Sequence, residues 1–347
     1  MKYERILKKL CRLPRLDPSI IIQSFAKSEG VSVRVSEASI EKPAFEVYCE
    51  NDIFLLLERP VSFHNVRSGR LTNTQVTLLE YASPVPLYLG QGELSRTLYE
   101  AHKSSRPHQA VDQWLEDIVE IELLVTYFIR HFSNSEALKN YRLIIFEAIE
   151  AFFMGLDHIA IMSLLPVFEG GLRNVQNLVL KEDLGNVSGD VFAKRLKQIL
   201  KEWGSRRVVQ YSWHPGVYGC DEIEVDFYTH ICPQADVMNC FLLFFKNVLY
   251  KNSSGGELGF NRHVILHMLD NDFNRPANFY RIFLALTHIA FIESLSNQKI
   301  PFFWPGYSAE SRRLSNYVEY LGASMDGRRN LLRGFGISGY PIRKDED

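Results

Sequence analysis

The amino-acid sequence predicts a mainly α-helical protein that begins with a small α+β domain. Apolar residues recur every three or four positions through most of the chain after residue 107, which is the period of an amphipathic helix. Short runs rich in β-branched and aromatic residues are concentrated before residue 95. The length of 347 residues exceeds that of one typical domain, so we expect at least two folded parts.

The first 95 residues predict one helix followed by short strands. Basic residues interrupt the leucines and isoleucines of residues 1–15, which is typical of an amphipathic helix and not of a secretion signal. Later runs contain residues that favour strands, and Gly, Asn and Pro residues separate them. The strands expected from these runs are 31–35, 45–49, 53–57, 75–79 and 85–89.

The rest of the chain predicts a series of helices. The first is marked by apolar residues at helical spacing, namely Trp114, Ile118, Ile121, Leu124 and Phe128. The others are expected at 143–155, 159–180, 190–203, 235–250, 277–295 and 308–321, with a loop at 211–219. We therefore expect an α+β domain of unknown role at 1–105, a helical domain at 106–300, and a C-terminal helix with a basic tail at 301–347.

Composition and charge narrow the function classes. The 39 Lys and Arg residues nearly balance the 41 Asp and Glu residues, so the net charge of -2 argues against a long nucleic-acid track. The 5 cysteines are scattered, which does not suit a secreted disulfide framework. The most apolar run, 240–250, is shorter than the roughly 18 residues of a membrane span. We therefore expect a cytoplasmic protein with no membrane contact.

The most informative segment lies between the helices expected at 235–250 and 277–295. A Ser- and Gly-rich stretch leads to Asn261, a favoured N-cap residue, at the start of a short helix. Arg262 and His263 follow in the first turn, where free backbone N–H groups and the helix dipole favour a phosphate. His267 lies about one turn later on a similar side of the helix.

The segment Phe260-Asn-Arg-His-Val-Ile-Leu-His267 resembles the motif of the HEPN superfamily, an Arg and a His separated by four to six residues with a polar residue after the Arg. The upstream segment 146–173 is similar to the helix pair that precedes this motif in abortive-infection-like members. The resemblance covers residues 111–297. One position departs from the pattern, because similar proteins often have Gly where Met268 follows the motif His.

The resemblance implies a helical bundle of HEPN type and a metal-independent endoribonuclease without a cofactor. Arg262 would hold the phosphate and His267 would transfer protons, while His263 would position either group or share the proton transfer. Asn261 and Glu169 would support these residues. One helix supplies too few groups to act on both sides of a phosphate, so the resemblance also implies a composite site at the interface of a homodimer.

The residue types suit the cleavage of RNA. RNA carries its own nucleophile in the ribose 2′-hydroxyl, so the protein must only remove a proton, stabilise charge on the phosphorus and protonate the leaving oxygen. Histidine exchanges protons near neutral pH, and arginine presents a planar fork of donors to phosphate oxygens. The resemblance further implies a toxin or abortive-infection effector of antiviral defence, whose N-terminal domain binds an antitoxin or another regulatory partner.

Other interpretations fit the same residues. The leading alternative is a non-catalytic HEPN dimer that binds RNA, a nucleotide or a protein without cleavage. Arg262 and His263 would otherwise be exposed loop-edge residues, with His267 a packing residue. A metal could bind His263 and His267, although no third ligand is evident. Glu169 could simply pair with Arg173 four residues later on the same helix.

Three further patterns carry weaker signals. Residues 334–339 satisfy the spacing GxGxxG, but too few residues follow to form the helix and strand of a dinucleotide site. Arg328, Arg329 and Arg333 form a basic surface that would contact an RNA backbone or would belong to a solvated tail. A zinc site from His230, Cys232 and Cys240 matches no standard spacing.

Overall fold

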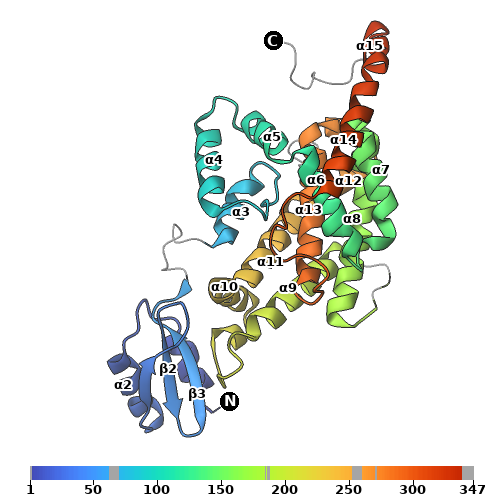
Figure 1. The fold of residues 1–347 in the computed structure, drawn as a ribbon. Coiled ribbons are helices and arrows are strands. Elements are labelled where there is room, and N and C mark those ends of the chain that lie inside the picture. The colour runs from blue at the N-terminus through green and yellow to red at the C-terminus, as the bar shows by residue number, and fades with distance from the viewer. Residues whose placement is uncertain are drawn as a thin grey trace. The chain divides into compact units, whose positions relative to one another are not determined.

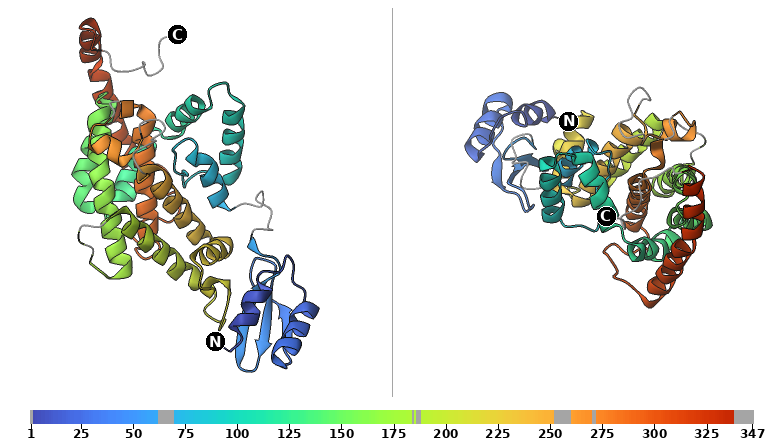
Figure 2. Two further views of the ribbon diagram at one scale, coloured as in Figure 1. Left: turned by 180° about the vertical axis from the view of Figure 1, so that it is seen from behind. Right: turned by 90° about the horizontal axis from the view of Figure 1, so that it is seen from above.

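The computed structural model describes residues 2–61, 70–183, 185, 188–251, 260–269 and 272–337. The described chain is mainly α-helical and includes a three-stranded antiparallel sheet, which confirms the predicted fold class (Figure 1). It forms two compact units, Met1–Val76 with Ala193–Leu242 and Thr77–Phe192 with Leu243–Asp347 (Figure 2). These bounds differ from the contiguous domains expected from the sequence, because a segment from the second half of the chain packs with the N-terminal residues.

The first unit begins with two helices and the sheet. Its elements are α1 (Glu4–Leu10), α2 (Pro18–Glu29), β1 (Arg34–Glu37), β2 (Ala44–Cys49) and β3 (Asp52–Leu57). The strand order is β1-β2-β3, with Val47 of β2 opposite both Val35 and Phe54. Asp17 begins α2, because its carboxylate accepts hydrogen bonds from the backbone N–H groups of Ser19 and Ile20. Strands β1, β2 and β3 confirm the first three predicted strands, although β1 lies closer to the C-terminus than expected.

The strands predicted at 75–79 and 85–89 are wrong. Residues 75–79 belong to α3 (Leu71–Leu79), where Gln75 and Leu78 are fully buried three positions apart. This burial follows the helical period, so packing outweighs the local β-forming composition. Residues 85–89 form turns and irregular chain. Pro84 and Pro86 lack the backbone N–H groups that a central strand would donate.

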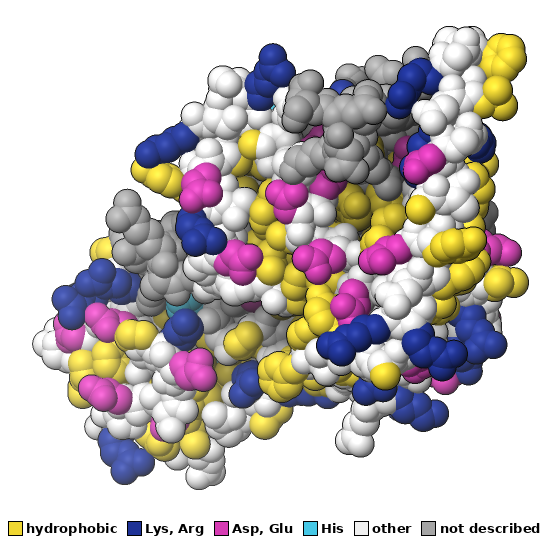
Figure 3. All heavy atoms as spheres, turned by 45° about the horizontal axis from the view of Figure 1, so that its top comes forward, with side chains coloured by type: hydrophobic (Ala, Val, Ile, Leu, Met, Phe, Trp, Pro, Cys, Tyr) yellow, Lys and Arg dark blue, Asp and Glu magenta, His cyan; other side chains and the backbone are white. Residues whose placement is uncertain are grey.

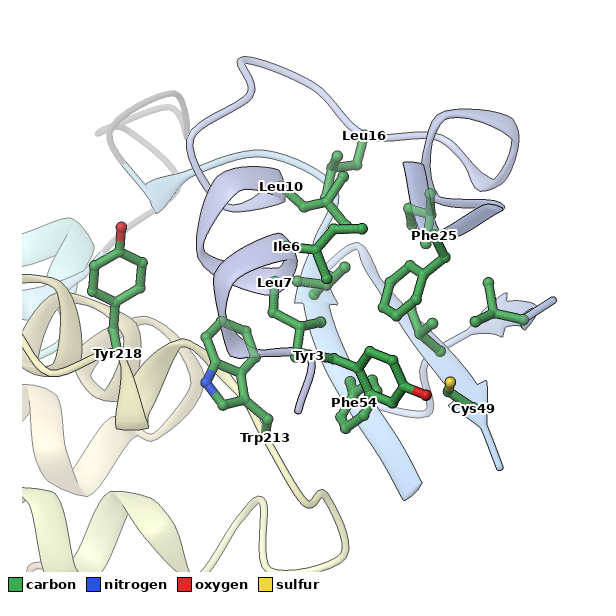
Figure 4. Close-up of a cluster of buried hydrophobic side chains, with 14 residues drawn as sticks. Tyr3, Ile6, Leu7, Leu10, Leu16, Phe25, Cys49, Phe54, Trp213 and Tyr218 are labelled. Atoms are coloured by element: carbon green, nitrogen blue, oxygen red, sulfur yellow. The ribbon is translucent and has the colours of Figure 1, made fainter. Parts of the chain in front are cut away.

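A hydrophobic cluster joins the sheet to α1, α2 and a later segment (Figure 4). The rings of Tyr3, Phe25 and Phe54 pack against one another: the centroid of Tyr3 lies 5.7 Å from that of Phe25 and 6.0 Å from that of Phe54, and Phe25 lies 6.4 Å from Phe54. Trp213 belongs to the same cluster although it lies in the loop expected at 211–219. The backbone N–H of Leu55 donates to the carbonyl of Trp213 at 2.9 Å, so this loop pairs with the edge of β3.

The remaining helices of the chain follow in order. They are α4 (Gln91–Lys103), α5 (Pro107–Ile118), α6 (Ile121–Arg130), α7 (Arg142–Phe153), α8 (Asp157–Leu180), α9 (Gly189–Ser205), α10 (Asp221–Ile231), α11 (Pro233–Phe244), α12 (Arg262–Leu266), α13 (Pro276–Ser294), α14 (Ala309–Ser324) and α15 (Asp326–Gly334). Short 3-10 turns lie at Phe132–Asn134, Lys139–Tyr141, Pro215–Val217 and Asp272–Asn274, and a π-helix at Phe245–Leu249. The helices predicted at 143–155, 159–180, 190–203, 277–295 and 308–321 are confirmed within a few residues.

Helix α13 forms the centre of the second unit, where α8 packs against both α7 and α13. Nearly every residue of α13 is buried, including Arg281 and His288. Arg281 pairs with Asp112 of α5 and donates to the carbonyl of Tyr81 at 3.0 Å. Burial lowers the pKa of His288 to about 4, and a ring nitrogen of His288 lies 3.0 Å from the carbonyl of Val85. These polar contacts connect residues 81–118 to the central helix.

Surface and composition features agree with the near-neutral charge. Lys and Arg side chains and Asp and Glu side chains both occur across the face drawn in Figure 3.

The five cysteines are free, and Cys49, Cys232 and Cys240 are buried. The helices of the described ranges include none that is long and apolar enough to cross a bilayer.

Candidate functional site

The motif helix α12 begins at its predicted N-cap. The side-chain oxygen of Asn261 accepts a hydrogen bond from the backbone N–H of His263 at 2.8 Å, and a longer one from that of Val264. The Asn261 amide donates to the carbonyl of Lys251 at 2.7 Å, and its side chain is buried. Asn261 therefore accepts from two of the N–H groups that were expected to face an anion, which leaves fewer of them available at this turn.

The C-terminal end of α12 has a tight left-handed turn. Met268 has φ 51°, a conformation that favours glycine. The N–H of Met268 donates to the carbonyl of Ile265 at 3.2 Å, and the N–H of Leu269 donates to that of Val264 at 2.9 Å. This pair of bonds is the Schellman arrangement, in which Gly usually occupies the left-handed position. Met268, the residue that departs from the HEPN pattern, thus has a backbone conformation that suits Gly.

Met268→Gly should therefore stabilise the protein by roughly 0.5–1 kcal/mol. Removing the side chain relieves left-handed strain of about 1–2 kcal/mol, while the added freedom of Gly in the unfolded chain costs about 0.5–1 kcal/mol. Met268 is 52% exposed, so little packing is lost. Urea unfolding would measure the change, with Leu269→Gly as the matched control that adds freedom without strain to relieve. A variant less stable than the wild type would contradict the expected relief of strain.

Arg262 points to α8, where Glu169 holds its guanidinium. Its Nε and Glu169 Oε1 form an ion pair between residues 93 positions apart in the sequence. The hydroxyl of Tyr250 donates to the same oxygen at 2.5 Å, and the guanidinium carbon of Arg262 lies 5.3 Å from the centre of the Tyr250 ring. The side chains of Arg262 and Glu169 are 33% and 20% exposed, so the pair is partly shielded from water.

Glu169 therefore contacts a residue of the motif. The simpler expectation, an ion pair between Glu169 and Arg173, does not describe this geometry. The Nε of Arg173 is buried and has no hydrogen-bond partner among the residues that the structure describes. Arg173 is nevertheless close enough for its charge to lower the pKa of Tyr250.

Tyr250 is a site residue that the sequence did not reveal. It follows the π-helix Phe245–Leu249, and its N–H donates to the carbonyl of Phe245, five residues earlier, at 2.9 Å. The wider turn stacks the Tyr250 ring on that of Phe245, with centroids 4.2 Å apart. Burial and the neighbouring Glu169 raise the pKa of Tyr250, so its hydroxyl stays protonated and donates to Glu169. An aromatic residue at the end of an apolar helix gave no signal beyond core packing.

The two histidines of the motif are more exposed than the contact between Arg262 and Glu169. His263 and His267 are both exposed, and their ring centroids lie 4.4 Å apart with the planes inclined by 55°. The backbone N–H of His267 donates to the carbonyl of His263 at 3.1 Å, which sets the one-turn spacing. The structure thus gathers Asn261, Arg262, His263 and His267 on one short helix and brings Glu169 to them from α8.

The basic C-terminal residues lie on a separate helix. Arg328, Arg329 and Arg333 belong to α15, and Arg329 pairs with Asp326 at 2.7 Å. Arg329 also donates to the carbonyl of Phe153 at 3.1 Å, at the end of α7. The GxGxxG pattern begins at the last residue of α15, and residues 338–347 lie outside the described residues.

The metal alternatives gain no third ligand. Within the described ranges, no group of three or more His, Cys, Asp or Glu side chains is arranged to hold a metal ion. This holds for His263 with His267 and for His230 with Cys232 and Cys240.

Comparison with protein families, with curated proteins and with solved structures finds no match to this chain. The chemistry of the site must therefore be inferred from its own residues.

Proposed function

We propose that the protein is a metal-independent endoribonuclease of HEPN type. The observation that carries this proposal is the exposed pair His263 and His267, with ring centroids 4.4 Å apart, on the helix that also presents Arg262. Imidazole groups serve as general acid and base near neutral pH, and the guanidinium group binds phosphate oxygens. These are the groups that cleavage through a 2′-hydroxyl requires.

The proposed reaction balances without a metal. An imidazole takes the proton of the ribose 2′-hydroxyl, and the 2′-oxygen forms a bond to phosphorus. The bond from phosphorus to the 5′-oxygen breaks, and an imidazolium gives this oxygen a proton. The products are a 2′,3′-cyclic phosphate and a 5′-hydroxyl. Arg262 stabilises the charge that develops on the phosphate oxygens, and Glu169 with Tyr250 fixes the direction of its guanidinium.

A homodimer would complete the site. The attacking and leaving oxygens lie on opposite sides of the phosphorus, whereas His263 and His267 share one side of one short helix. A second copy would supply the opposite histidine. Met268 and Leu269 follow directly after His267 and are 52% and 60% exposed, so they offer apolar surface for such a contact. In this proposal the protein acts in the cytoplasm as a toxin or abortive-infection effector, restrained by a partner of its N-terminal unit.

A second candidate is a HEPN dimer that binds RNA, a nucleotide or a protein without cleavage. One observation favours it, because Glu169 already neutralises the charge of Arg262. A phosphate would have to share or displace this contact, which suits reversible binding as well as catalysis. The two candidates differ in a measurable way, since only the first breaks the RNA chain.

The test uses a defined RNA and the same strand with 2′-deoxyribose throughout, each incubated with the purified full-length protein in EDTA. We expect cleavage of the RNA alone, with cyclic phosphate and 5′-hydroxyl ends. The double variant His263→Ala/His267→Ala, purified in parallel, controls for contaminating nucleases and should leave the RNA intact. Cleavage of the deoxy strand, or equal cleavage by the double variant, would exclude the proposed reaction. Binding of intact RNA without cleavage would favour the second candidate.

A further inference from the structure

Helix α1 has one side fixed in the core of the first unit. Tyr3, Ile6, Leu7 and Leu10 are buried in the hydrophobic cluster shown in Figure 4. Because these residues recur at helical spacing, the opposite side of α1 must face outward. The orientation of the helix is therefore set by packing, and the residues of the outer side are held in place.

The outer side of α1 is basic. Arg5, Lys8 and Lys9 lie on the helix, and Lys2 and Arg12 lie in the turns that precede and follow it. Lys2 and Lys8 pair with carboxylates, Glu50 at 3.1 Å and Glu4 at 2.7 Å.

The other three cations of this side have no carboxylate partner in the described part of the chain. Arg5 and Lys9 are exposed, and the Nε of Arg12 donates to the hydroxyl of Tyr218 at 2.8 Å. Arg5 and Lys9 lie four residues apart and repel each other, and Arg5 in the first turn opposes the helix dipole. The chain has a net charge of -2, yet it concentrates unpaired positive charge on one side of this helix. This arrangement does not stabilise the helix itself.

We propose that this side of α1, formed by Arg5, Lys9 and Arg12, binds the phosphate backbone of RNA. Arg5 and Lys9 lie one turn apart on α1 and Arg12 lies in the turn that follows the helix, so the three separated cations match a polymer with repeated charges better than a single phosphate. The choice of RNA rests on the proposed function, in which RNA is the substrate. The surface adds affinity without sequence preference, because contacts to phosphates do not read bases.

A membrane surface fits this helix less well. Amphipathic helices bind bilayers by inserting an apolar side between the lipids. The apolar side of α1 is already buried against α2 and the sheet, and Tyr3, Leu7 and Leu10 are at most 2% exposed. Only electrostatic attraction to lipid headgroups therefore remains available. The phosphate backbone of RNA can be bound by electrostatic attraction alone.

The test measures binding without cleavage. A short, fluorescently labelled 2′-O-methyl RNA lacks the nucleophile, so its fluorescence anisotropy reports affinity even if the protein is not a nuclease. The variant Arg5→Gln/Lys9→Gln/Arg12→Gln is compared with Arg142→Gln/Lys299→Gln/Arg313→Gln, which removes the same charge from exposed positions of the second unit. Circular dichroism and thermal unfolding confirm that each variant is folded.

We expect the α1 variant to bind RNA at least tenfold more weakly, and the slope of log affinity against log salt to fall by about 2, at roughly 0.7 per lost phosphate contact. The control variant should keep the wild-type affinity and slope. The 2′-O-methyl RNA cannot be cleaved by the proposed reaction, so a failure of that reaction leaves this inference standing. Unchanged RNA binding by the folded α1 variant would overturn it. Binding of the wild type to phosphatidylserine vesicles but not to RNA would overturn it as well.

Discussion

His267→Ala should lower the rate of RNA cleavage by about 10²–10⁴-fold while the protein stays folded. General acid–base groups contribute factors of this size, and the substitution removes one of the two exposed imidazoles of the motif. The side chain of His267 is exposed, and its backbone N–H still donates to His263 after the change. Initial rates with a defined RNA in EDTA would measure the effect.

The matched control is His102→Ala. His102 is also exposed and lies in the last turn of α4, so the substitution removes the same side chain from a helix end away from the motif. We expect wild-type rates for this variant. If His267→Ala and His102→Ala cleave RNA equally fast, His267 takes no part in proton transfer.

Asp112→Ala should destabilise the protein by about 3–5 kcal/mol, because it removes the only charge that pairs with Arg281 among the described residues. The guanidinium of Arg281 is fully buried. Its remaining partners are neutral, namely the side-chain oxygen of Asn278 at 2.8 Å and the carbonyl of Tyr81. A loss of this size is a large part of the roughly 5–15 kcal/mol that stabilises an ordinary domain.

Asp117→Ala provides the comparison on the same helix. Asp117 is exposed and accepts a hydrogen bond from Gln113 at 2.9 Å, so its removal should cost no more than about 0.5 kcal/mol. Urea unfolding of both variants would give the difference between a buried and an exposed carboxylate. Equal stability of the two variants would show that Asp112 does not compensate the buried charge of Arg281.

The sequence predicted the elements whose pattern is long and regular. Helix α13 was expected at 277–295 and found at Pro276–Ser294, because a run of that length satisfies only the helical period. The N-cap Asn261 was likewise predicted, since capping depends on neighbouring residues alone. Residues 75–79 were misassigned because a short β-forming run is ambiguous, and the burial of Gln75 and Leu78 decided its structure.

Some features of the candidate site were likewise predicted from the sequence, and others were found only in the structure. Arg262, His263 and His267 could be grouped from the sequence, because positions 262–267 span little more than one helical turn, and His263 and His267 are spaced four apart on it. The contacts of Arg262 with Glu169 and Tyr250 could not be derived in this way. They depend on how α8 and the π-helix before Tyr250 pack against α12, and no local pattern specifies such packing.

The sequence by itself determined the mainly α-helical class, the order of the long helices, the capped motif helix and the near-neutral charge. Each of these follows from composition or from residues within a few positions of one another. The tertiary structure alone decided that Trp213 completes the N-terminal core, that Asp112 pairs with the buried Arg281, and that Glu169 holds Arg262. These contacts join residues separated by many positions, and their partners are selected by the shape and charge of packed surfaces.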